Sequence, residues 1–133
     1  MIGVITYVHN PLNFDVIFPY DDSPYPGAKP IKRALCFEYD KESDEFKEPI
    51  ERDVYQIRLK GLTRKDIKFK DGMQKHRLIQ KLNRSGCLVL VDITSIDTYK
   101  RLEATVRDPV EKFSYSEWLL QKYPDIYHKY RDR

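Results

Sequence analysis

The chain has 133 residues, a net charge of +3 at pH 7, and 41% hydrophobic and 34% charged residues. This length suits one hydrophobic core, and the composition is that of a folded domain rather than a disordered chain. No apolar run approaches the roughly 20 residues that a membrane-spanning helix needs, and residues 1–5 lack the features of a secretory signal. We therefore expect a single domain over residues 1–133 of an intracellular protein, with no membrane partner. Cys36 and Cys87 are expected to be two buried thiols in a reducing compartment.

Charge is segregated along the chain. Residues 38–53 contain eight acids and three bases, a net charge of −5, whereas residues 58–84 contain ten bases and two acids, a net charge of +8. Such a domain presents a polyanion-binding face on one side only. The alternative is that both segments are ordinary solvated surface.

The first half of the chain predicts strands around an irregular excursion. Residues 4–8 and 14–18 alternate in polarity across a turn-rich stretch and predict a β-hairpin. The prolines in residues 19–33 predict an irregular connection, followed by a short strand over 34–39 and an acidic loop or hairpin tip over 40–53. Residues 54–60 predict a strand that places Tyr55, Ile57 and Leu59 on one face.

The second half predicts helices and two more strands. Residues 72–84 have helical spacing, with Asp71 as the N-cap and Gly86 after the C-terminus. Residues 87–93 are apolar on both faces and predict a covered central strand, and a turn over 94–100 leads to a strand over 101–106. Ser114 and Glu117 form a capping box for a helix, and residues 125–130 predict further helical turns.

Five short strands with one inserted helix favour an α+β, mainly β, fold. We expect an OB-type five-stranded Greek-key barrel with about three helices and an inserted connection over residues 19–53. Tyr7, Tyr20, Tyr25, Tyr99 and Tyr115 are candidates for stacking on bases, and core packing is the alternative role for these tyrosines.

The same order of elements and four local strings resemble the staphylococcal nuclease-like (thermonuclease) family. Residues 8–16 (VHNPLNFDV) match V-x-D-G-D-T-F-x-V, and residues 55–66 (YQIRLKGLTRKD) match Y-x-V-R-L-x-G-I-D-x-P-E. Residues 97–106 (DTYKRLEATV) are similar to D-x-Y-G-R-x-L-A-x-V, and residues 116–120 (SEWLL) to the start of the closing helix. The likeness covers nearly the whole chain and implies an SNase-like barrel.

In that family a calcium ion held by carboxylates supports phosphodiester hydrolysis, and two arginines stabilise the transition-state charge. The resemblance places the arginines at Arg58 and Arg101 and the water-activating acid at Asp66. The two metal-binding aspartates fall on Leu12 and Thr63, which supply no carboxylate. A backbone-carbonyl ligand falls on Arg64 and the family proline on Lys65, so the site loses two negative charges and gains two positive ones.

These departures predict no metal and no cofactor. Arg58, Lys60, Arg64, Lys65 and Arg101 are then the expected phosphate-binding residues, because guanidinium groups bind phosphate as bidentate forks. In this interpretation Arg58, Asp66 and Arg101 are vestiges of a catalytic site. Alternatively, Arg58 is an exposed strand residue paired with a local acid such as Asp66 or Glu103, and Arg101 has a similar role.

Three functions remain open. The first is a non-catalytic nuclease-like domain that binds nucleic acid or phosphate. The second is a protein-interaction or structural module that uses residues 38–53, residues 19–33 or the tail over 127–133. The third is an active nuclease with a rebuilt metal site, the only case in which Ca²⁺ is expected. The residue usage is typical of an AT-rich genome, including that of a large DNA virus.

Overall fold

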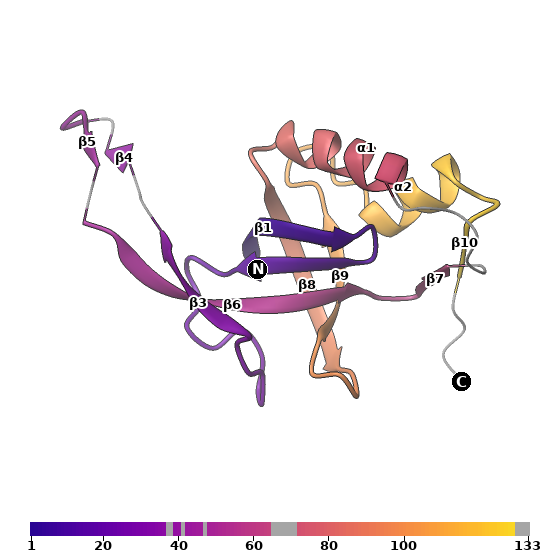
Figure 1. Cartoon of the computed structure of the whole chain (residues 1–133), viewed down its shortest axis with the longest axis horizontal. Coiled ribbons are helices and arrows are strands. Elements are labelled where there is room, and N and C mark those ends of the chain that lie inside the picture. Colours follow the sequence, from indigo (N-terminus) through magenta and orange to yellow (C-terminus); the bar gives the residue numbers. More distant parts are fainter. Residues whose placement is uncertain (37–38, 41, 47, 65–71, 130–133) are drawn as a thin grey trace.

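The computed structural model describes residues 1–36, 39–40, 42–46, 48–64 and 72–129 (Figure 1). Asp66, Lys65 and the N-cap expected at Asp71 lie outside this part of the chain. Two helices are described, α1 (Gly72–Asn83) and α2 (Tyr115–Lys122). Neither is long and apolar enough to cross a membrane. The strands are β1 (Ile2–Asn10), β2 (Asn13–Ile17), β3 (Lys32–Cys36), β4 (Tyr39–Asp40), β5 (Glu45–Phe46), β6 (Ile50–Leu59), β7 (Leu62–Arg64), β8 (Leu88–Ile96), β9 (Leu102–Arg107) and β10 (Tyr127–Lys129).

Five of these strands close into a mixed β-barrel. They are hydrogen-bonded in the order β2-β1-β8-β9-β6, and β2 pairs with β6 to complete the ring. The β6–β9 pairing is parallel, and the others are antiparallel. The structure is therefore α+β and consistent with an OB-like barrel.

The core follows from strand alternation. Phe14 and Val16 of β2 and Ile57 of β6 are fully buried, because every second side chain of these strands points into the barrel. Leu78 of α1 and Leu119 of α2 belong to the same buried cluster, so the helices cover the barrel with their apolar faces.

The connection expected over residues 19–53 contains a two-stranded ribbon. β3 pairs with residues 50–54 of β6, and β4 pairs with β5 near the tip. Figure 1 shows this ribbon extending away from the barrel and the helices. Leu35 and Ile50 are 58% and 44% exposed, so this part of the ribbon buries little apolar surface.

Several predicted elements differ from the observed ones. Residues 127–129 form β10 instead of a helical turn, because Tyr127 is buried and its backbone pairs with Arg64 of β7. The strand predicted over 87–93 is central, between β1 and β9, but only one face is covered, and Leu88 is 43% exposed. Cys36 and Cys87 are free and half-buried instead of buried.

The N-cap half of the predicted capping box is present at the start of α2, whereas in the described chain the Glu117 side chain makes no return bond to the Ser114 backbone. Ser114 accepts a hydrogen bond from the backbone N–H of Glu117 at 3.1 Å, which satisfies one of the unpaired donors of the first helical turn. Tyr115, the first residue of α2, is fully buried, so the cap fixes a helix end that is part of the core.

Replacing Ser114 by alanine is expected to lower the free energy of unfolding by about 1 kcal/mol, because this donor loses its acceptor. Urea unfolding followed by the fluorescence of Trp118 measures the change. Ser116→Ala is the matched control, since within the described chain the Ser116 side chain makes no hydrogen bond. Equal losses in both variants would contradict the role assigned to the cap.

Candidate functional site

A cavity of about 320 Å³ lies where β6 turns into β7. It is lined by Arg58, Leu59, Lys60, Gly61, Leu62, Thr63 and Glu103. Gly61 allows the chain to reverse there, because its φ of +74° lies in the left-handed region that glycine adopts without strain. The parallel register places Glu103 of β9 beside Arg58 of β6. The cavity thus carries two cations and one carboxylate.

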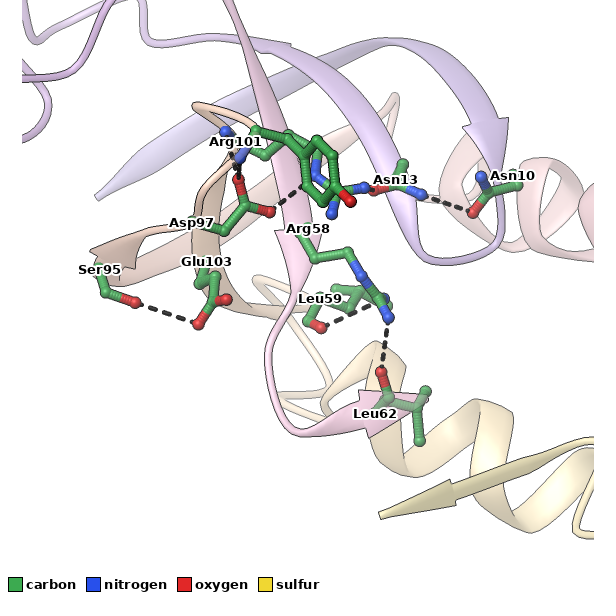
Figure 2. A network of polar contacts seen from close by, with 10 residues as sticks. Asn10, Asn13, Arg58, Leu59, Leu62, Ser95, Asp97, Arg101 and Glu103 are labelled. Atoms are coloured by element: carbon green, nitrogen blue, oxygen red, sulfur yellow. Dashed lines mark hydrogen bonds and ion pairs between the residues drawn. The ribbon is translucent and has the colours of Figure 1, made fainter. Parts of the chain in front are cut away.

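Arg58 is held against the turn. Alternation along β6 buries Ile57 and Leu59 and leaves the side chain of Arg58 on the outer face of the barrel. Its guanidinium donates to the carbonyl oxygen of Leu62 at 3.0 Å and to that of Leu59 at 3.5 Å. Figure 2 shows the side chain turned toward Leu62. These bonds position the guanidinium at the wall of the cavity.

Arg101 has different partners. Its Nε donates to Asp97 Oδ2 at 2.7 Å, and its Nη1 donates to Asn13 Oδ1 at 2.9 Å. Asp97 Oδ1 also accepts the backbone N–H groups of Tyr99 and Arg101. The guanidinium lies 5.1 Å from the centroid of the Tyr99 ring, a cation–π contact. Arg101 therefore ties the β8–β9 loop to β2 (Figure 2).

The five expected phosphate-binding residues do not share one place in the described chain. Arg58 and Lys60 line the cavity, whereas Arg101 is not among its lining residues. Arg64 lies on β7, where its backbone pairs with Tyr127. Lys65 falls outside the described residues. The sequence patterns did not predict that Arg101 would bind Asp97 and Asn13.

The positions expected for metal ligands have the wrong chemistry for calcium. Leu12 is 7% exposed and belongs to the core, and its carbonyl oxygen accepts the N–H of Leu59 at 2.9 Å. Thr63 lies on β7, beside His128 of β10, and offers a neutral hydroxyl. Within residues 1–36, 39–40, 42–46, 48–64 and 72–129, no three His, Cys, Asp or Glu side chains gather as a metal site. Neither Leu12 nor Thr63 therefore supplies the carboxylate that calcium prefers.

One polar pair, between an exposed histidine and a buried aspartate, was not predicted from the sequence. His9 Nε2 lies 2.6 Å from Oδ1 of Asp15, a side chain that is only 2% exposed, and Lys32 Nζ lies 3.9 Å from the other carboxylate oxygen. Asp15 thus points away from the core, because its neighbours Phe14 and Val16 face inward. The alternating pattern of residues 14–18 was the available signal for this placement.

The structure also places the cysteine Cys87 and four of the candidate tyrosines. Burial raises the pKa of the Cys87 thiol, which disfavours the thiolate form. Tyr115 is fully buried, so of the two roles considered for it core packing is observed, and burial raises its pKa to about 12. Tyr20 and Tyr99 are 79% and 77% exposed and Tyr7 is 52% exposed, so their rings are accessible.

No protein-family model, curated protein or solved structure matches this chain, so the comparisons identify no family for it.

Asp97→Ala is expected to lower the free energy of unfolding by about 2 kcal/mol, because the carboxylate accepts three hydrogen bonds and faces a half-buried cation. Asp97→Asn is expected to lose less, since an amide oxygen still accepts the two backbone N–H groups. Urea unfolding measures both changes. The exposed Asp92 of β8 provides the control, and a loss in Asp92→Ala equal to that in Asp97→Ala would contradict the assignment.

Proposed function

We propose that this protein binds nucleic acid through its phosphates, without hydrolysing them, on an SNase-like Greek-key barrel. The observation that carries the proposal is a cavity with two cations and one carboxylate, combined with an apolar side chain at an expected metal-ligand position. Arg58 and Lys60 supply positive charge at the cavity, while Leu12, at the position where the resemblance requires a metal-binding aspartate, is buried in the core. Phosphate binding needs only the cations, whereas metal-assisted hydrolysis also needs carboxylate ligands.

The distribution of charge supports a polymeric anion over a small one. Residues 72–84 contain four bases and no acid, and all four bases lie on α1 or directly after it. The described residues 39–40, 42–46 and 48–53 contain seven acids and one base, and they belong to the ribbon that extends away from the helices in Figure 1. A polyanion bound at the cavity and α1 would avoid the acidic ribbon, because like charges repel.

A second candidate function is a protein-interaction module. The exposed Leu35 and Ile50 favour it, because a two-stranded ribbon outside a barrel has little apolar burial of its own. Its open strand edge is a surface on which another strand can pair.

Fluorescence anisotropy of labelled single- and double-stranded DNA and RNA tests the first function. The affinity is expected to fall steeply as salt rises, because phosphate binding releases counterions. Lys60→Gln is expected to weaken binding to all sequences alike and to reduce the salt slope by about one. Arg58→Gln is expected to act in the same direction.

Lys29→Gln is the control, because it removes one exposed charge outside the cavity. An affinity that is independent of salt would contradict phosphate recognition and favour the protein-interaction module. Plasmid DNA incubated with Ca²⁺, Mg²⁺ or Mn²⁺ tests the non-catalytic part of the proposal. Cleavage by the natural protein that is lost in Arg58→Ala would contradict that part.

A further inference from the structure

A second group of cations surrounds a small groove between α1 and α2. The groove has a volume of about 150 Å³ and is lined by Arg77, Gln80, Lys81, Arg84, Trp118 and Lys122. Three of these cations belong to α1 and the segment directly after it, at positions i, i+4 and i+7, and therefore lie on one face. Lys122 and Trp118 lie four residues apart on α2 and also face each other along that helix. The groove shares no lining residue with the Arg58 cavity.

The cations of the groove have no carboxylate partner in the described chain. None of Arg77, Lys81, Arg84 and Lys122 takes part in an ion pair there. Arg77, Arg84 and Lys122 are exposed, and Lys81 is half-buried. Four like charges around so small a space repel one another, so an anion that enters the groove relieves an existing repulsion.

Aromatic rings hold two of the lysines at the groove. Lys81 Nζ lies 4.5 Å from the centroid of the Phe113 ring and 5.9 Å from that of Trp118. Lys122 Nζ lies 5.4 Å from the Trp118 centroid. These cation–π contacts position the ammonium groups without neutralising them, which lowers the entropy lost when they bind an anion.

The groove also combines charge with one aromatic surface. Trp118 is its only apolar lining residue and is half-buried, with the Tyr123 ring packed edge-on at a centroid distance of 6.4 Å. From Arg77 to Lys81 the rise along α1 is roughly 6 Å at 1.5 Å per residue, and Arg84 follows directly after the helix. Cations spaced over such a length beside an aromatic ring are typical of sites that follow a single-stranded backbone and stack its bases.

We propose that the α1–α2 groove binds single-stranded nucleic acid, with phosphates on Arg77, Arg84 and Lys122 and a base against Trp118. This inference rests on the proposed function and adds a second binding site to it. A duplex fits less well because its bases are stacked inside and do not reach the indole. An acidic peptide or an anionic membrane would use the cations but would have no base to place on Trp118.

Trp118 is the only tryptophan of the chain, so its fluorescence reports directly on the groove. Titration with an oligothymidylate of about twelve nucleotides is expected to quench this emission to saturation. Arg77→Gln with Arg84→Gln is expected to reduce the salt slope of oligothymidylate binding, measured by anisotropy, by about 1.4, because each phosphate contact on a single strand contributes about 0.7. Trp118→Ala is expected to weaken binding about tenfold, and Trp118→Phe to retain most of the affinity.

The control variants separate the two proposals. Oligothymidylate could bind without changing Trp118 emission, and the Arg77→Gln, Arg84→Gln variant could keep the natural salt slope while Lys60→Gln binds more weakly. That result overturns the groove inference and leaves the proposed function standing. If no nucleic acid binds at low salt, the proposed function is overturned together with the inference. If polyglutamate or phosphatidylserine vesicles quench Trp118 as strongly at the same charge concentration, the groove takes another class of partner and the inference is wrong.

Discussion

The closure of the barrel by β2 against β6 is the constraint on which the rest of the structure depends. This pairing places Asn13 opposite Arg58 and brings the carbonyl oxygen of Leu12 to the N–H of Leu59. Asn13 then accepts a hydrogen bond from Arg101. The start of β2 therefore fixes the turn at Leu12 and the backbone position of Arg58. Through Asn13 it also positions the guanidinium of Arg101. Because Leu12 faces the core there, the place that the resemblance assigns to a metal ligand is filled by apolar packing.

Arg58 and Arg101, the two arginines that match the family pattern, have different surroundings. Arg101 is bound to Asp97 and Asn13, so its charge is largely compensated by a carboxylate 2.7 Å away, and binding a phosphate there would compete with an existing ion pair. Arg58 lies at a cavity wall together with Lys60 and Glu103, and its guanidinium donates to two backbone carbonyl oxygens. The cations of α1 and α2 have no carboxylate partner in the described residues, which makes the helix side the more strongly attractive surface for a polyanion. A protein that binds phosphates without a metal depends on such charges.

Local patterns predicted the parts of the fold that depend on neighbouring residues. The alternation in residues 54–60 indicated which side chains of β6 are buried, and the Ser114–Glu117 pattern indicated the start of α2. The patterns failed where distant pairing decides the structure. Residues 127–129 have little strand character of their own, and they become β10 only because β7 offers them an edge. Local patterns also could not reveal that Arg101 donates to Asn13, which is 88 residues away in the chain.

The sequence by itself determined the order of the elements, the separation of acidic and basic segments, and the replacement of two expected carboxylates by Leu12 and Thr63. These are properties of residue type and short-range spacing, which the printed chain contains. Only the tertiary structure decided which cations gather and which are compensated. It tied Arg101 to Asp97 and joined Lys122 and Trp118 of α2 to the cations of α1. The physical reason is that electrostatic interactions depend on distance in space and on burial, and the folded chain alone sets both.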